Sequence, residues 1–252
     1  MVQLEPSERL EPIGGGHSVI VSPAHTFNTD TILLAHYSMP KRGERCAEFG
    51  TGCGMISLLW CCRSAPRAVY ALEIQPQACG QARRGAQQNG FAQMQVLEYD
   101  LRRLAEEPAK ALPLPLDLDL VACNPPYKPL GTGIRNPHGS KAAARHETGC
   151  TFAQVAAAAA RVLRWGGRFV CCLRPERLAE ACCVLSAAGL EPKRLRLVQH
   201  RVQKAPSLFL LEARRGGKTG LTVEPVLLLE EETGACTAEM KAIYGEYGEG
   251  YK

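Results

Sequence analysis

The chain has 252 residues, of which 46% are hydrophobic and 22% are charged, and its net charge is +5. This composition is typical of a globular protein with one large domain and excludes a disordered chain. No apolar run approaches the ~18 residues of a membrane helix, and the charged start MVQLEPSERL lacks the apolar core of a signal peptide. We therefore expect a cytoplasmic protein with no membrane partner.

The element pattern predicts an α/β protein. After an extended N-terminal stretch and a helix that Asn28 or Thr29 would cap, short apolar runs of strand character alternate with helix-like stretches. Such alternation indicates parallel strands joined by right-handed crossovers, with helices on both faces of the sheet. Strands are expected at residues 45–49, 67–74, 94–99, 118–123 and 168–174, and helices at 27–38, 54–65, 76–90, 150–167 and 175–189.

The last two strands break the parallel pattern. Only the loop HRVQKAP separates the strand-like runs 193–199 and 207–215. A parallel crossover needs roughly a dozen residues or more, so this pair should be antiparallel. The sequence thus predicts a seven-stranded, mostly parallel, Rossmann-like sheet with an antiparallel last strand.

The C-terminal part of the chain differs in charge from the rest. Residues 221–252 contain seven glutamates and two lysines, a net charge of −5, which leaves +10 on residues 1–220. We expect residues 1–220 to form the main domain and residues 221–252 to form a small extension packed on it. The positive excess of the main domain would suit a polyanionic partner.

The twelve cysteines form no recognisable framework. No C-x-x-C spacing occurs, which argues against the usual zinc and redox sites. Three vicinal pairs lie inside apolar segments. We expect buried, reduced thiols that act as small hydrophobic residues, and no metal site.

A glycine-rich loop, EFGTGCG at residues 48–54, follows the first predicted parallel strand and opens a helix. Such loops let the backbone approach a ligand closely and direct amide groups at an anion. The nicotinamide fingerprint is G-x-G-x-x-G, and here the third glycine, Gly54, comes one residue early. The loop alone indicates a nucleotide-like ligand without identifying it.

Polar residues stand at the ends of four predicted strands: Glu48, Glu73, Asp100 and Asn124. Ligands of an open parallel sheet bind beyond the carboxyl ends of its strands, so these side chains should converge. A carboxylate after the second strand can accept both ribose hydroxyls, and one after the third can accept from an adenine amine. The alternative is that all four are solvated strand-end residues.

With these features, residues 25–215 resemble the class I S-adenosylmethionine-dependent methyltransferases. EFGTGCG looks like their motif I, Glu73 like their ribose-binding acid and Asp100 like their adenine-side acid. The predicted antiparallel last strand is also similar to the last strand of these methyltransferases. The resemblance implies S-adenosyl-L-methionine as the cofactor, bound by Phe27, Thr29, Glu48, Gly50, Gly52, Gly54, Glu73, Ile74, Asp100, Leu101 and Asn124.

The sequence NPPY at residues 124–127 is a more specific feature. In this superfamily, (D/N/S)-P-P-(Y/F/W) marks enzymes that methylate a planar nitrogen, either a base amine or a glutamine amide. The Asn124 side-chain oxygen and the Pro125 carbonyl would accept its N–H groups, and Tyr127 would stack on it, worth ~1–3 kcal/mol for a base. We predict these three residues as catalytic; the alternative is a simple turn, which Asn and Pro also favour.

The segment after this motif is basic. Residues 128–149 carry Lys128, Arg135, Lys141 and Arg145 against Glu147. A basic lid beside the cofactor would suit RNA phosphates, so we predict these four cations as substrate-binding residues. The alternative is a solvated loop.

The closest resemblance is to the valine tRNA adenine-N(6)-methyltransferase family. It rests on FNTDTILLA, NPPY, AARHE, LRWGGRFVCCLRPERL and the C-terminal segment EARRGGKTGLTVEPVLLLEEETGACTAEMKAIY, and is nearly full length. It implies methylation of an adenine exocyclic amine in tRNA, next to the anticodon.

Two rival functions remain. Glutamine N5-methyltransferases of release factors also use NPPY, but they typically carry an N-terminal helical domain of ~70 residues, whereas 47 residues precede Glu48 here. The basic lid and the C-terminal extension also favour tRNA. A non-catalytic nucleic-acid-binding protein would show a broken motif I or NPPY, and both are intact. Whether the protein is a monomer or a homodimer is open.

Overall fold

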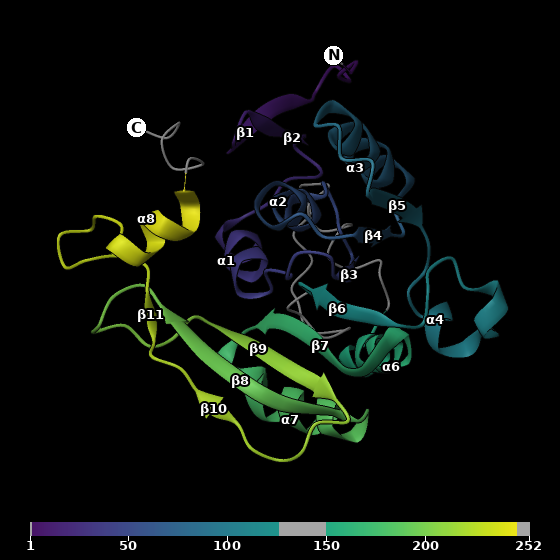
Figure 1. Cartoon of the computed structure of the whole chain (residues 1–252). Coiled ribbons are helices and arrows are strands. Elements are labelled where there is room, and N and C mark those ends of the chain that lie inside the picture. The colour runs from purple at the N-terminus through teal and green to yellow at the C-terminus, as the bar shows by residue number, and fades with distance from the viewer. Residues whose placement is uncertain (1, 126–149, 246–252) are drawn as a thin grey trace, which may run out of the picture.

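The computed structural model describes residues 2–125 and 150–245. Within this part of the chain, a nine-stranded sheet forms the centre of the protein, in the order β10-β8-β9-β7-β6-β3-β4-β5, with β11 also paired to β8 (Figure 1). A separate antiparallel hairpin, β1 with β2, precedes it. The strands are β1 (Arg9–Gly14), β2 (His17–Val21), β3 (Arg45–Phe49), β4 (Ala68–Glu73), β5 (Met94–Glu98), β6 (Leu118–Cys123), β7 (Leu163–Leu173), β8 (Leu190–Gln199), β9 (Leu208–Arg215), β10 (Thr222–Val223) and β11 (Leu227–Leu228).

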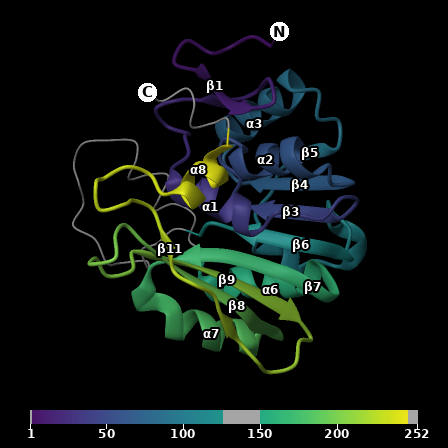
Figure 2. The same cartoon turned by 60° about the vertical axis from the view of Figure 1, so that its left-hand side comes forward.

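The α/β prediction and the antiparallel last strand are confirmed. Strands β5, β4, β3, β6 and β7 pair in parallel, and the first four are stacked in that order in Figure 2. Strand β9 is antiparallel to both β7 and β8. The predicted strand number is too low by two, because β10 and β11 of the C-terminal extension add to β8. An edge strand exposes unpaired backbone groups, and these short strands cover them.

Helices cover both faces of the sheet. Side chains of α1, α2 and α3 join one buried cluster, and side chains of α4, α6 and α7 join the other. Helix α8 contributes Met240 and Ile243 to the first cluster and packs beside α1 (Figure 1). The helices are α1 (Thr29–Tyr37), α2 (Met55–Ser64), α3 (Pro76–Gln88), α4 (Arg103–Glu106), α6 (Phe152–Val162), α7 (Leu178–Ala187) and α8 (Ala238–Tyr244), with short 3-10 turns at Ala109–Ala111 and Pro175–Arg177.

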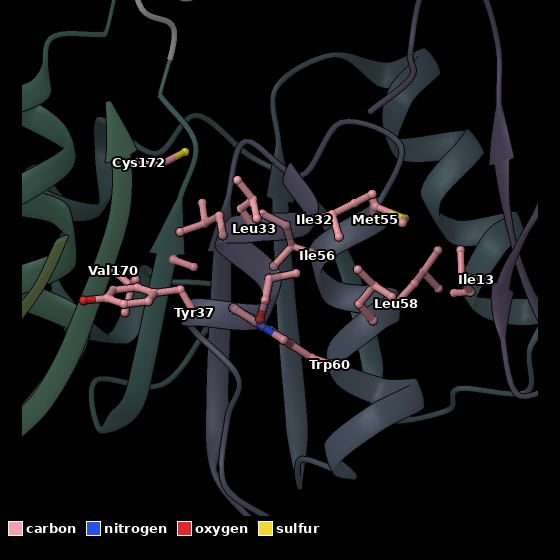
Figure 3. Close-up of a cluster of buried hydrophobic side chains, with 14 of the residues drawn as sticks. Ile13, Ile32, Leu33, Tyr37, Met55, Ile56, Leu58, Trp60, Val170 and Cys172 are labelled. Atoms are coloured by element: carbon pink, nitrogen blue, oxygen red, sulfur yellow. Dashed lines mark hydrogen bonds between the residues drawn. The ribbon is translucent and has the colours of Figure 1, made fainter. Parts of the chain in front are cut away.

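The first cluster fixes helices α1 and α2 against the sheet. Figure 3 shows Ile32 and Leu33 of α1 close to Ile56 of α2, with Trp60 below them. Trp60 is fully buried, and its indole Nε1 donates a hydrogen bond to the Ala35 carbonyl oxygen at 3.3 Å. Because a buried indole N–H needs an acceptor, this bond ties the two helices together.

The structure decides the predicted start of helix α1 and corrects the predicted end of helix α6. Asn28, rather than Thr29, caps α1, since its Oδ1 accepts the Thr31 N–H at 3.1 Å. The C-terminal end predicted for the helix at 150–167 is wrong. The helix ends before Leu163, whose backbone is extended, with φ −70° and ψ 142°. The glycine pair expected to stop this helix lies instead inside β7, where Gly166 has φ +75°.

None of the twelve cysteines, all of which the structure describes, forms a disulfide. Seven are buried, but Cys183 and Cys236 are exposed, so the prediction of buried thiols fails there. Among the described residues, no helix has the length and apolarity needed to cross a membrane.

Candidate active site

The strand register places the predicted site residues side by side. Phe49 of β3 is paired with Leu72 of β4 and with Cys123 of β6. The residues that directly follow these three therefore lie side by side in one row, with Gly50 between Glu73 and Asn124. This row stands at the carboxyl edge of the parallel strands, where ligands of such sheets bind.

The glycine loop has the backbone geometry of a ligand cradle. Gly50, Gly52 and Gly54 have φ of +73°, +54° and +86°, a region that residues with a Cβ rarely adopt. A Cβ on Gly50 or Gly52 would meet nothing within 4 Å, so space lies open beside both. A Cβ on Gly54 would lie 3.2 Å from Ala82 Cβ and from Met94 Cε. The first two glycines thus leave room for a ligand, and the early third glycine serves helix packing.

Glu48 is buried beneath this loop, with 2% of its surface exposed. Its Oε2 accepts hydrogen bonds from Thr51 Oγ1 at 2.7 Å, Ser57 N at 2.9 Å and Ser57 Oγ at 2.5 Å. Burial raises the pKa of Glu48 to about 7, against the lowering effect of these hydrogen bonds. In this structure Glu48 therefore holds the loop to the start of α2.

Glu73, at the end of β4, is directly bonded to the glycine loop. Its Oε2 accepts the Gly52 N–H at 2.9 Å, and its Oε1 accepts the N–H groups of Ile74 at 2.9 Å and Gln75 at 3.0 Å. Glu73 is buried, with 5% of the residue surface exposed. These bonds fix its orientation at the place where the sequence predicts the ribose-binding acid, while Ile74 beside it is 39% exposed.

Asp100 lies beyond β5 and is paired with Arg102. The Arg102 side chain donates from Nε to Asp100 Oδ1 and Oδ2, both at 2.9 Å, and the Arg102 backbone N–H donates to Oδ1 at 3.0 Å. These bonds hold the pKa of Asp100 below its usual value. An ionised carboxylate is an acceptor only, as an adenine amine requires. Leu101 next to it is half-buried against the second cluster.

The two residues predicted at the N-terminal side lie at α1. Phe27 is partly buried against the first cluster. Thr29 is the first residue of α1, and its Oγ1 lies 3.3 Å from the Tyr244 hydroxyl of α8. The C-terminal extension therefore reaches a residue that the sequence assigns to the cofactor site.

Asn124 follows β6, and a buried cysteine of the neighbouring strand contacts it. Because Cys123 is paired with Cys171, the next residues, Asn124 and Cys172, face each other. The Cys172 thiol, fully buried, donates to Asn124 Oδ1 at 3.2 Å. Figure 3 shows Cys172 at the border of the buried cluster. This contact orients the amide oxygen of Asn124.

The remaining predicted residues are Pro125 and five residues that follow it in the chain. Pro125 is described and buried. Five others lie outside the described residues, namely Tyr127, Lys128, Arg135, Lys141 and Arg145. In the part of the chain that the structure describes, no group of three His, Cys, Asp or Glu side chains is arranged to hold a metal ion.

Sequence reasoning did not identify four residues that support the site: Thr51, Ser57, Arg102 and Cys172. A signal exists for Thr51 and Ser57, since hydroxyl residues near a buried glutamate are natural donors to it. Cys172 can be found only from the register of β6 and β7.

The glycine loop, the acid Glu73 and the neutral amide Asn124 lie together at one edge of the sheet, as the sequence predicts for a methyltransferase. The sequence matches the methyltransferase small domain family over residues 22–176. The chain belongs to this family and is an S-adenosylmethionine-dependent methyltransferase.

Two bacterial relatives are similar to this chain over most of their length. A tRNA1(Val) (adenine(37)-N6)-methyltransferase of Tolumonas auensis is 26% identical over 243 residues, covering 92% of this chain and 97% of the relative. The protein of the same name from Aeromonas hydrophila is 28% identical over 190 residues, covering 75% of this chain and 76% of the relative.

Solved structures share the fold. A predicted O-methyltransferase from Agrobacterium tumefaciens aligns with a TM-score of 0.67 and 23% identity, covering 87% of this chain and 97% of that one. TYW2 from M. jannaschii in complex with AdoMet aligns with a TM-score of 0.55 and 13% identity, covering 85% and 90%.

Proposed function

We propose that this methyltransferase modifies the exocyclic amine of an adenine in tRNA, forming N6-methyladenosine next to the anticodon. The observation that carries the proposal is the row at the sheet edge, in which Gly50 lies between an acid, Glu73, and a neutral amide, Asn124. Two relatives named for adenine(37) of tRNA1(Val) support the substrate, and their similarity extends over most of this chain.

The residues present fit S-adenosylmethionine. Gly50 and Gly52 leave open space beside a backbone with positive φ. Glu73 is oriented for ribose hydroxyls and Asp100 is ionised for an adenine amine. When bound, S-adenosylmethionine supplies an electrophilic methyl group.

The role of Asn124 follows from the chemistry of the target. An adenine amine has a lone pair delocalised into its ring, so it is a weak nucleophile. An acceptor that binds one of its N–H groups orients the nitrogen, and a fixed acceptor costs no reorganisation during the reaction. Because Asn124 is neutral, it accepts from the amine without forming an ion pair with a cationic cofactor.

We also propose that the extension, residues 221–252, is part of this catalytic domain. Two contacts support this. Arg63 of α2 donates to the carbonyl oxygens of Ile243 at 2.8 Å and Tyr244 at 2.9 Å, at the end of α8. Arg196 of β8 forms an ion pair with Glu239 at 2.7 Å.

Mass spectrometry of nucleosides from the tRNA of a deletion strain tests the function. We expect N6-methyladenosine to disappear from tRNA and to return when the purified protein and S-adenosylmethionine are added. Unchanged N6-methyladenosine, together with loss of glutamine methylation on a release factor, would refute the proposal in favour of the protein substrate.

A further inference from the structure

A cavity of about 640 Å³ lies away from the candidate active site, at the amino end of β7. Its lining includes Trp165, Arg161 and Arg215, with alanine and glycine residues between them. Trp165 is the third residue of β7, whereas the candidate site lies beyond Leu173. The regularly paired residues Arg168 to Leu173 alone span about 16 Å, so this Trp165 cavity is separate from the site of methyl transfer.

A bulge in β7 directs Trp165 outward. Leu118 of β6 pairs with Leu163, but Leu120 pairs with Arg168, so several residues of β7 have no partner in β6. Gly167 is needed there, because a Cβ would lie 3.0 Å from the Leu118 carbonyl oxygen. Bulges of this kind re-aim side chains and are common near functional sites.

The indole itself rests on a glycine. A Cβ on Gly216, which has φ +65°, would lie 2.1 Å from a carbon of the Trp165 ring. One part of the ring therefore packs on the Gly216 backbone, yet 74% of Trp165 is exposed. The chain thus presents an aromatic surface to solvent at a place where two glycines make its position possible.

The two arginines of the cavity have no acidic partner among the described residues. Arg161 donates from Nη2 to the Glu107 carbonyl oxygen at 2.8 Å, and Arg215 donates from Nη1 to the Leu163 carbonyl oxygen. The buried Nε of Arg161 has no hydrogen-bond partner in the part described. A guanidinium group has five N–H donors, so both retain donors for an anion.

We propose that the Trp165 cavity is a second RNA-binding site, at which Arg161 and Arg215 contact phosphates and a base stacks on Trp165. Two unpaired cations beside an exposed aromatic ring are the combination that binds a nucleic-acid strand. The inference rests on the proposed function, because a ligand that also reaches the methylation site, more than about 16 Å away, must be a long RNA such as tRNA.

Tryptophan fluorescence tests the stacking directly, because the chain has only two tryptophans and Trp60 is fully buried. We expect saturating tRNA to protect the native protein from acrylamide quenching. Trp165→Phe should remove this protection while the variant still binds tRNA. Trp165→Ala should bind tRNA about 10-fold more weakly, and its fold should be unaffected because this side chain is exposed.

The arginines are tested by the salt dependence of tRNA binding. Arg161→Gln and Arg215→Gln should each lower the slope of log affinity against log salt by about 1. Arg83→Gln is the matched control, since Arg83 of α3 also donates to a backbone carbonyl, that of Val96 at 3.2 Å. This control should keep the native slope.

The outcomes separate the two proposals. If the native protein methylates tRNA but bound tRNA leaves acrylamide quenching and the affinity of Trp165→Ala unchanged, the second site is refuted and the proposed function stands. Native protein that neither binds nor methylates tRNA would refute both.

Discussion

Glu73, at the end of β4, is an acid that accepts three backbone N–H groups, whereas Asn124, at the end of β6, is a neutral amide that accepts a hydrogen bond from the Cys172 thiol. The first half of the site is thus held by several hydrogen bonds to a carboxylate group, which are stronger than bonds between neutral groups. The second half is neutral, and its contact with β7 is made through a weak S–H donor. From this difference in charge we propose that the acids bind the cofactor and that the amide accepts from a neutral group.

The largest effect should come from the neutral half. Asn124→Ala removes the predicted acceptor of the target amine, so we expect kcat to fall about 10³-fold, the upper end of the effect of losing one preorganised hydrogen-bonding group. Affinity for S-adenosylmethionine should stay within a few-fold. Methyl-transfer kinetics and calorimetric titration measure the two quantities.

The conservative variant Asn124→Asp keeps an acceptor oxygen and should retain part of the activity. Equal losses of turnover and cofactor affinity in Asn124→Ala would show that Asn124 supports the cofactor instead.

A pH effect should appear in the acidic half. Burial raises the pKa of Glu48 to about 7 in the folded chain, above about 4.3 in an unfolded chain. Its contribution to stability is therefore present at acid pH and is lost as the pH rises through 7. Glu48→Gln has no group that titrates at this position. Between pH 4 and pH 8 the free energy of unfolding of the native protein should therefore fall by about 3 kcal/mol more than that of the variant.

Urea unfolding at several pH values measures this difference. The same pH dependence in both proteins would mean that Glu48 is ionised normally under the loop.

Cofactor affinity should depend on Glu73. Glu73→Gln keeps an oxygen for the loop amides but removes the charge that would accept the ribose hydroxyls. We expect about 100-fold weaker binding of S-adenosylmethionine, with kcat at saturating cofactor close to native. A fall in kcat with unchanged binding would exchange the roles of Glu73 and Asn124.

The sequence predicts the acidic half better than the neutral half. Strand ends can be located from apolar runs, so the row from Glu48 to Asn124 follows once the strands are parallel. The partners of those residues depend on register and on side-chain direction. Arg102 pairs with Asp100 from two residues away, and no periodicity indicates it.

The bulge in β7 shows the same limit for the fold. The alanine-rich run and the glycines at 166 and 167 favour a helix that ends at glycine. The helix ends at Val162 because Leu163 already pairs with Leu118 of β6. Tertiary pairing outweighs local propensity there, and a single sequence does not record that pairing.

The smallest effect we predict tests the link from β7 to Asn124. Cys172→Ala removes the thiol that bonds Asn124 Oδ1 at 3.2 Å. One hydrogen bond contributes about 0.5–1.5 kcal/mol, so kcat should fall about 5-fold while cofactor affinity stays native. Cys172→Ser supplies a hydroxyl donor and should recover activity.

Cys171→Ala is the matched control, because Cys171 is equally buried in the same strand but belongs to the cluster on the opposite face of the sheet. It should lose stability like Cys172→Ala yet keep its kcat. If both alanine variants lose turnover equally, general loosening of β7 explains the effect. If only Cys172→Ala loses turnover, the thiol positions the amide, and the neutral half of the site extends one strand further than the NPPY motif indicates.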